Sequence, residues 1–278
     1  MKYKAVISDL DGTLLGEDHK ISEYTKRVIK SVIDKGVKFF IATGRHHTDV
    51  SAIKKTLNLD TVMITSNGAR VHDEKDKEIF ASNLPQSLSQ EILDLKFDKG
   101  IHVNVYAGDY WYLEEEAWWA KEFHSESGFT YSIIDFEELK ETDITKFFYL
   151  HEDPKVIKEL EEFFKEKYGD SLQIVRSLPI CLEIMNKNTT KGVAITELLK
   201  AEGIDLSETI SFGDGLNDLE MLSITGKAFI MKNGSKTLKE TLPNLEVIGS
   251  NTEDGVAKKL EEIFEVGGSN ESSITEGN

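Results

Sequence analysis

The sequence contains a single cysteine, only four prolines and no apolar run as long as a membrane-spanning helix. The lone Cys181 excludes an internal disulfide framework, and its place in the apolar run LPICLEIM predicts a small packing residue. A membrane span needs about 20 consecutive apolar residues, and the opening MKYKAVISD has no apolar signal-like region. We therefore expect a soluble, cytoplasmic protein with no membrane partner.

Positive charge is also scarce, with 33 Lys and Arg against 50 Asp and Glu and a formal net charge of −17. A field of that sign repels nucleic acid and anionic membranes, so neither is expected as a partner. It also disfavours anionic substrates unless the site supplies local positive charge. Hydrophobic residues make up 39% of the 278 residues, which is enough for a core in one large or two smaller domains.

The most informative run is KAVISDLDGTLL, in which Asp9 and Asp11 follow a hydrophobic strand expected at 4–8. Alternate residues of an extended segment point the same way, so the two carboxylates can converge on one point. Oxygen ligands of this kind suit Mg²⁺. A strand that ends in an acidic turn is the simpler alternative. An EF-hand is excluded because Leu14 and Lys20 occupy its glycine and glutamate positions.

Three more segments repeat this arrangement of a hydrophobic strand followed at once by polar or glycine residues. They are VKFFIATGR at 37–45, VMITSNGA at 62–69 and TISFGDGLND at 209–218. Each alone fits an ordinary turn. In an open parallel sheet, however, ligands bind outside the carboxyl ends of the strands. If these strands are neighbours, one edge of the sheet carries Asp9, Thr43, Asn67 and Asp214.

The order of predicted elements indicates an α/β fold. Strands and helices alternate from residue 4 to 65, which is typical of a parallel sheet with right-handed crossovers. Short mixed strands and helices follow from about residue 84, and the alternation resumes after the polar joint NKNTTKG at 186–192. We therefore predict a Rossmann-like parallel-sheet core domain, 1–83 plus 189–266, with an inserted α+β domain at 84–188. The Gly/Ser-rich end, 267–278, is expected to be a disordered tail.

Four of these motifs together resemble a known family. DLDGTLL, ATGR, Lys191 ahead of a helix, and GDGLND match, in order, the four motifs of haloacid dehalogenase superfamily phosphatases. SNGA at 66–69 is similar to the extra signature of their Cof-type branch, and the long insertion between the second and third motifs fits that branch. The resemblance covers about residues 1–266 and is most specific at the first and fourth motifs. It implies that the inserted domain is a cap over a catalytic core.

The resemblance also implies residue roles. Asp9 is the expected nucleophile, forming an aspartyl-phosphate, and Asp11 is the expected general acid and then general base. The expected cofactor is Mg²⁺, and its implied ligands are Asp9, the main-chain carbonyl of Asp11, Asp214 and Asp218. Phosphate-binding groups are expected from Leu10, Thr43, Gly44, Lys191 and Asn217, with Arg45 and Asn67 as additional candidates.

The implied function is a Mg²⁺-dependent phosphatase of small phosphorylated metabolites, with sugar phosphates as the expected substrates. A phosphomutase or phosphotransferase, and a phosphatase of pyridoxal phosphate or flavin mononucleotide, remain open alternatives. A non-catalytic phosphometabolite-binding regulator is a third class. It predicts the loss of Asp9, Asp11 or Asp214, all of which are present.

Two further features have alternative interpretations. An aromatic-rich stretch in the inserted domain is either a stacking surface for a ring-bearing substrate or part of that domain's core. We expect the core, because Trp119 and Phe123 stand four residues apart on one expected helix. His46 and His47 follow TGR and are either metal ligands or part of a solvated helix start, and we expect the solvated start. The aromatic residues are Tyr106, Tyr110, Trp111, Tyr112, Trp118, Trp119 and Phe123.

Overall fold

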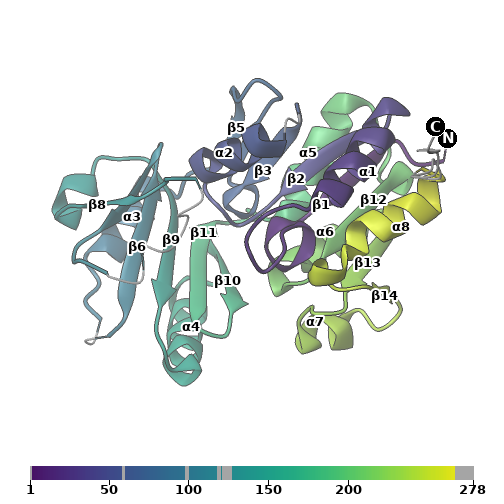
Figure 1. The fold of residues 1–278 in the computed structure, drawn as a ribbon. Coiled ribbons are helices and arrows are strands. Elements are labelled where there is room, and N and C mark those ends of the chain that lie inside the picture. The colour runs from purple at the N-terminus through teal and green to yellow at the C-terminus, as the bar shows by residue number, and fades with distance from the viewer. Residues whose placement is uncertain (1, 58–59, 98–99, 118–119, 121–126, 267–278) are drawn as a thin grey trace, which may run out of the picture.

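The chain forms two β-sheets, each with its own helices (Figure 1). The computed structural model describes residues 2–57, 60–97, 100–117, 120 and 127–266. The first sheet has eight strands in the order β14-β13-β12-β1-β2-β3-β4-β5, and the second has six in the order β10-β11-β9-β6-β7-β8. The predicted fold class, a parallel-sheet core with a second α+β domain, is confirmed.

The first sheet is built from both ends of the sequence. Six of its strands run parallel: β1 (Ala5–Ser8), β2 (Lys38–Ala42), β3 (Val62–Thr65), β12 (Thr209–Gly213), β13 (Lys227–Met231) and β14 (Glu246–Ile248). β1 lies at the centre between β2 and β12. The antiparallel strands β4 (Arg70–His72) and β5 (Glu78–Ala81) extend one edge.

Helices cover both faces of this sheet, which explains why its central strands are buried throughout. One hydrophobic cluster joins the sheet to α1 (Glu23–Asp34), α2 (His47–Leu57) and α8 (Gly255–Phe264). A second cluster on the other face includes α5 (Lys191–Glu202), α6 (Leu219–Ile224) and α7 (Lys236–Thr241). The start of α5 is fixed by Thr190, whose hydroxyl accepts a hydrogen bond from the N–H of Val193.

The second sheet packs two helices on one face and an aromatic cluster on the other. Its elements are α3 (Gln86–Leu93), β6 (His102–Ala107), β7 (Tyr110–Leu113), β8 (Tyr131–Ile133), β9 (Ile144–Leu150), α4 (Pro154–Tyr168), β10 (Leu172–Leu178) and β11 (Cys181–Asn186). Tyr106, Trp111 and Cys181 are buried in the aromatic cluster. The packing role predicted for Cys181 is confirmed, and two of the listed aromatics belong to the core of this domain.

Two linkers, residues 82–84 and 186–190, carry the chain between the sheets and run side by side. The hydroxyls of Ser82 and Thr189 are 3.0 Å apart, and the Asn186 amide donates to Ser82 Oγ at 3.1 Å. Nearby, Arg70 of the first sheet donates to Thr145 Oγ1 of the second at 2.7 Å. The entry to the second sheet and the return from it therefore meet at one place.

Four elements were not expected from the sequence: β4, β5, β8 and α7. All four are short, so none of them carries a long hydrophobic pattern, and β5 is exposed at every position. The helix expected at 115–127 lies mostly outside the described residues, as do Trp118, Trp119, Phe123 and the tail at 267–278. Among the helices that the structure describes, none has the length and apolar character needed to cross a membrane.

Candidate active site

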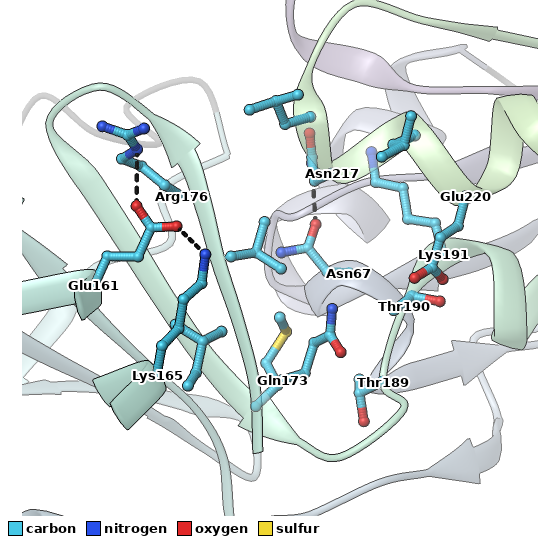
Figure 2. Close-up of a pocket in the computed structure, with 15 residues that line it drawn as sticks. Asn67, Glu161, Lys165, Gln173, Arg176, Thr189, Thr190, Lys191, Asn217 and Glu220 are labelled. Atoms are coloured by element: carbon cyan, nitrogen blue, oxygen red, sulfur yellow. Dashed lines mark hydrogen bonds and ion pairs between the residues drawn. The ribbon is translucent and has the colours of Figure 1, made fainter. Parts of the chain in front are cut away.

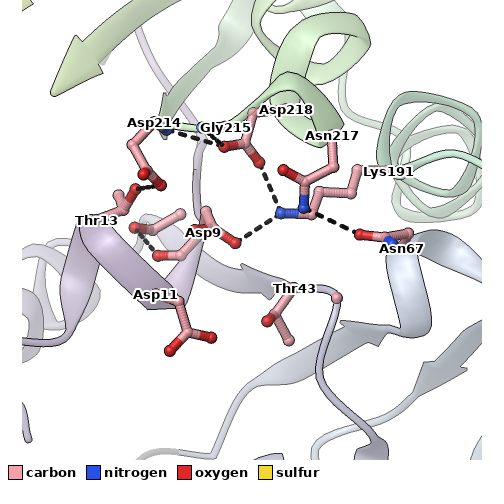
Figure 3. Close-up of polar contacts among 12 residues, drawn as sticks. Asp9, Asp11, Thr13, Thr43, Asn67, Lys191, Asp214, Gly215, Asn217 and Asp218 are labelled. Carbon is pink, nitrogen blue, oxygen red and sulfur yellow. Dashed lines mark hydrogen bonds and ion pairs between the residues drawn. The ribbon is translucent and has the colours of Figure 1, made fainter. Parts of the chain in front are cut away.

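The carboxyl ends of four neighbouring strands meet at one edge of the first sheet. β12, β1, β2 and β3 are consecutive in the sheet and parallel. Their polar residues surround a common space (Figure 3), as the sequence predicted for Asp9, Thr43, Asn67 and Asp214. Because parallel strands end on the same side, short sequence motifs far apart in the chain become one site.

Three carboxylates and one lysine form the centre of this site. Lys191 Nζ lies 2.6 Å from Asp9 Oδ1 and 2.6 Å from Asp218 Oδ1. Lys191 and Asp218 are fully buried, and Asp9 is 5% exposed. One ligand oxygen from each of Asp9, Asp214 and Asp218 lies within 4.8 Å of the others. Clustered carboxylate oxygens of this kind fit a Mg²⁺ ion.

Glycines allow these carboxylates to approach one another. Gly12 has a φ of +74°, and a Cβ there would lie 2.5 Å from Asp214 Oδ2. A Cβ on Gly213 would lie 2.6 Å from the Cβ of Asp218. The turn after β12 is closed by Asp218 Oδ2, which accepts hydrogen bonds from the N–H groups of Asp214 and Gly215, both at 2.9 Å. The glycines of DGT and GDG are therefore required by close packing around the carboxylates.

Crowding changes the protonation of these groups. Burial, opposed by Lys191 and reinforced by the neighbouring aspartates, raises the pKa of Asp9 well above its usual value. Burial and Asp218 raise the pKa of Asp214 to about 7. Burial lowers the pKa of Lys191, but its ion pairs with Asp218 and Asp9 outweigh burial and raise it overall. Negative charge here is costly, and a bound divalent cation would stabilise the ionised carboxylates.

Asp11 faces a different partner, the guanidinium of Arg45. Two hydrogen bonds join them, from Arg45 Nε to Asp11 Oδ2 at 2.7 Å and from Nη2 to Oδ1 at 2.6 Å. Arg45 Nη1 also donates to Asp49 at 2.9 Å. Burial raises the pKa of Asp11, but hydrogen bonds from Arg45 and His19 outweigh it and lower the pKa overall. Arg45, a candidate phosphate ligand, is thus engaged with two carboxylates in this structure.

The remaining candidates form a small polar shell beside Lys191. The N–H of Asn67 donates to the carbonyl of Thr43 at 2.9 Å, and Asn217 Nδ2 donates to Asn67 Oδ1 at 3.1 Å. A Cβ on Gly44 would lie 3.1 Å from Asn67 Oδ1, so these residues are in close contact. Leu10 is buried and opens the turn Leu10–Leu14. All of the sequence-predicted residues therefore lie near this edge of the sheet.

A pocket of about 280 Å³ opens next to Lys191, between the two sheets (Figure 2). The first sheet and its helices contribute Asn67, Lys191 and Asn217 to its wall. The second sheet contributes Gln173 and Arg176 across the gap, together with apolar side chains. The pocket has the mixed lining expected for a small polar ligand.

Sequence reasoning missed the charged residues of the second sheet that reach this site, among them Arg176, Lys146 and Glu183. Lys146 Nζ lies 3.2 Å from Glu183 Oε2 and donates to the carbonyl of Gly44 at 2.9 Å. Asn67 Nδ2 donates to Glu183 Oε2. A signal was present for Lys146 and Glu183, because each charge interrupts an apolar strand, ITKFFYL and CLEIMN.

The expectation of a solvated helix start at His46 was wrong. His46 is 1% exposed, and its Nε2 lies 3.0 Å from the carbonyl of Gly108 in the second sheet. His47 Nε2 lies 2.9 Å from Asp109 Oδ1, and the His47 ring stacks on His72 with ring centroids 4.4 Å apart. These histidines therefore pack between the two sheets.

This packing predicts a loss of stability in acid. Burial, together with His47 and Arg70, lowers the pKa of His72 to about 4, whereas an unfolded histidine titrates near about 6.5. Between those values the unfolded state binds a proton that the folded state does not, so the free energy of unfolding falls as pH falls. The expected loss from His72 between pH 7.5 and pH 5 is on the order of 1–2 kcal/mol.

Chemical denaturation of the wild type and of His72→Phe at both pH values measures this effect. The variant keeps an aromatic ring against His47 and should lose less stability in acid than the wild type. Asp214, whose raised pKa acts in the opposite direction, is present in both proteins and cancels in the difference. If the wild type and His72→Phe lost the same free energy of unfolding between pH 7.5 and pH 5, the loss could not be assigned to His72.

Comparison with known proteins gives concordant matches along nearly the whole chain. The profile of a family described as haloacid dehalogenase-like hydrolase matches residues 6–260. A protein of Haemophilus influenzae, provisionally named a phosphatase, is 41% identical over 266 residues, covering 95% of this chain and 98% of that protein. An HMP-PP phosphatase of Yersinia pestis is 31% identical over 258 residues, covering 93% and 94%. A solved structure described as a sugar phosphatase of subclass IIB is 25% identical, covers 94% and 99% of the two chains, and superposes with a TM-score of 0.80.

Proposed function

This chain belongs to the haloacid dehalogenase-like hydrolases and is a phosphatase, and from that premise we propose a Mg²⁺-dependent phosphatase of small phosphorylated metabolites, sugar phosphates first among them. The observation that carries the proposal is the arrangement of Asp9, Asp214 and Asp218 around Lys191. Phosphoryl transfer requires a nucleophile, a proton donor and positive charge around the phosphoryl oxygens. This edge of the sheet offers a group for each task.

The acidic cluster fits a magnesium ion. Asp9 and Asp214 would hold it with their carboxylates, Asp11 with its main-chain carbonyl, and Asp218 directly or by orienting the others. A bound Mg²⁺ would offset the charge of the phosphoryl group. Asp218 is well placed for the orienting role, because it already accepts two main-chain hydrogen bonds and the Lys191 ion pair.

Asp9 is the proposed nucleophile. Its carboxylate attacks the phosphorus, the bond to the leaving oxygen breaks, and Asp11, once released from Arg45 and protonated, gives that oxygen a proton. Water then attacks the phosphorus of the aspartyl-phosphate and gives a proton to Asp11. The bond between phosphorus and the Asp9 oxygen breaks, inorganic phosphate leaves, and both residues are restored. Lys191 supports attack by Asp9 because it fixes one carboxylate oxygen and leaves the other available.

The phosphoryl oxygens are proposed to bind the hydroxyl of Thr43, the N–H groups of Leu10 and Gly44, the Asn217 amide and Lys191. Arg45 is a further candidate, because a phosphoryl dianion would compete with Asp11 and Asp49 for its guanidinium. Asn67 is proposed to support Asn217 through the hydrogen bond between them. The organic part of the substrate would extend into the pocket beside Lys191.

We also propose that residues 84–188 act as a cap over a core formed by 1–83 and 189–266. The support for this division is the pair of linkers tied by Ser82 and Thr189. A cap that closes over bound substrate excludes water and completes the pocket.

A substrate panel tests the proposed function. Inorganic phosphate would be measured after incubation with sugar phosphates, nucleotides, pyridoxal phosphate, flavin mononucleotide and HMP-PP, the last suggested by the name of the Yersinia pestis relative. We expect release from at least one class and highest kcat/KM for a sugar phosphate. Transfer of phosphate to an added sugar, rather than to water, would favour the phosphomutase or phosphotransferase alternative. No release from any member would contradict the proposal.

Asp11→Asn should separate substrates by their leaving groups. The variant keeps Asp9 and the main-chain carbonyl of residue 11 but cannot donate a proton. Turnover of alkyl phosphates should fall by about 10²–10⁴-fold, because their leaving oxygen needs a proton. The loss should be smaller for p-nitrophenyl phosphate, whose leaving group departs unprotonated, and a burst of p-nitrophenol should precede slow hydrolysis of the phosphoenzyme. Equal losses without a burst would assign the proton transfer to another group.

A further inference from the structure

Lys146 on β9 and Glu183 on β11 form a buried ion pair on neighbouring strands of the second sheet. Lys146 is 3% exposed and Glu183 is 7% exposed, and their charged atoms lie 3.2 Å apart. Lys146 Nζ also lies above the rings of Tyr106 and Phe148, at 4.9 and 5.2 Å from their centroids. A buried ion pair contributes little stability relative to well-packed apolar residues. Its position therefore points to another role.

Both members of the pair bind the first sheet beside the proposed phosphoryl site. Lys146 donates to the carbonyl of Gly44 at 2.9 Å, and Glu183 Oε2 accepts from Asn67 Nδ2. The other oxygen of Glu183 accepts from Ser177 at 3.0 Å within the second sheet. The carboxylate is thus held from its own side and presented to Asn67.

Glu183 determines which way the Asn67 amide faces. A carboxylate only accepts hydrogen bonds, so the amide nitrogen of Asn67 must point toward the second sheet. The amide oxygen then points into the site, where it accepts from Asn217 Nδ2 at 3.1 Å. Asn217 Nδ2 carries two hydrogens, and the second can serve a phosphoryl oxygen. The contacts from Glu183 through Asn67 to Asn217 form a continuous relay.

Lys146 acts beside this contact, on the main chain of Gly44. The carbonyl oxygen of Gly44 is the negative end of a peptide dipole and would repel a phosphoryl group if it turned toward the site. Lys146 binds this oxygen from the second sheet and holds it there. Because Glu183 balances the charge of Lys146, the pair adds little net charge near the phosphoryl site. Its effect comes instead from the positions in which it holds Gly44 and Asn67.

We infer that Lys146 and Glu183 are positioning residues that assemble the phosphoryl-binding groups of the first sheet, Gly44 and the Asn67–Asn217 pair, when the second sheet rests against it. The inference rests on the proposed function, because it assumes that these groups bind a phosphoryl oxygen. It explains why two charges stand inside apolar strands. It also links phosphate affinity to contact between the two sheets.

The double variant Lys146→Met/Glu183→Met tests this role, because it removes both charges together and leaves no side-chain oxygen to accept from Asn67. Calorimetric titration with inorganic phosphate in the presence of Mg²⁺ should show an affinity about tenfold weaker than wild type, as for the loss of one charge-assisted hydrogen bond. KM for the best phosphate ester should rise by about the same factor with kcat little changed, since binding to substrate and transition state weakens alike. Lys158→Met/Glu162→Met, in an exposed ion pair on α4, makes the same substitutions and serves as the matched control.

The outcomes separate the two proposals. A wild type that neither binds phosphate nor hydrolyses esters contradicts the proposed function. A wild type that binds phosphate, with a double variant that binds it within about twofold, overturns the positioning role. A loss confined to kcat would also overturn it, because the relay predicts weaker binding.

Asn67→Gly provides a second test that leaves the ion pair in place. Glycine accepts the φ of +55° at this position, so the turn keeps its shape. The substitution should weaken phosphate binding in the wild type but add little in the Lys146→Met/Glu183→Met background, because Asn67 has already lost the acceptor at residue 183 there. Additive losses would show that Asn67 and the pair act independently and would overturn the inference. This comparison stands even if the double variant is less stable, since both backgrounds can be assayed below their unfolding transitions.

Discussion

Treatment with excess chelator should abolish phosphate release, and added Mg²⁺ should restore it whereas Ca²⁺ should not. Asp9, Asp214 and Asp218 place three carboxylates within 4.8 Å of one another, and the Lys191 ammonium offsets only part of that charge. Mg²⁺ requires near-octahedral geometry with short bonds, whereas Ca²⁺ takes more ligands at longer distances. The larger ion would therefore move the phosphoryl group relative to Asp9.

Metal-free protein would be prepared by dialysis against chelator, and phosphate release would be followed as each cation is titrated back. Circular dichroism of the metal-free protein serves as the control, because the loss must occur in a folded enzyme. Full turnover in excess chelator, or equal recovery with Ca²⁺, would contradict the assignment of this cluster to magnesium.

Asp9→Asn should eliminate turnover and leave no phosphoenzyme to trap. The amide is nearly the same shape and can still accept the hydrogen bond from Lys191, but it cannot attack phosphorus. Loss of an enzyme nucleophile costs on the order of 10⁴-fold or more in rate. The fold should be retained, because the asparagine side chain has nearly the same volume and keeps an oxygen to accept from Lys191.

Phosphate release and mass spectrometry of acid-quenched enzyme would measure both effects. Asp170→Asn changes an exposed aspartate in the turn between α4 and β10 and should behave as wild type. A phosphorylated Asp9→Asn protein would assign the nucleophile to another residue.

The sequence predicted the centre of the site because each of its residues directly follows a buried parallel strand or begins a helix. The meeting of Asp9 and Asp214 could be predicted from their positions directly after two strands that are neighbours in the sheet. The burial of Lys191 was not visible in the sequence, since lysines are usually exposed. The match of Lys191 to the third family motif predicted that it lies near Asp9, but only the structure shows its ion pairs with Asp9 and Asp218.

Other features depend on how two separate sheets meet, which no local pattern records. Lys146 and Glu183 acquire their contacts only when the second sheet lies against Gly44 and Asn67. His46 looked like a polar helix start because its covering group, the carbonyl of Gly108, comes from a distant turn. The pairing of Arg45 with Asp11 was missed for another reason: both follow strands of the first sheet, but they are 34 positions apart in the sequence.

Because the two linkers lie side by side, the second domain is joined to the first sheet at a single place, where another domain could replace it. Because Ser82 and Thr189 touch, the insertion leaves the first sheet and returns to it at one point, and its length places no strain on the strands that carry Asp9 and Asp214. A different domain could be grafted between these two positions without changing the register of β1 against its neighbours. In the proposed arrangement, replacement at this single junction would change the lining of the pocket and leave the carboxylate cluster in place, but a new domain would have to supply its own contacts to Gly44 and Asn67.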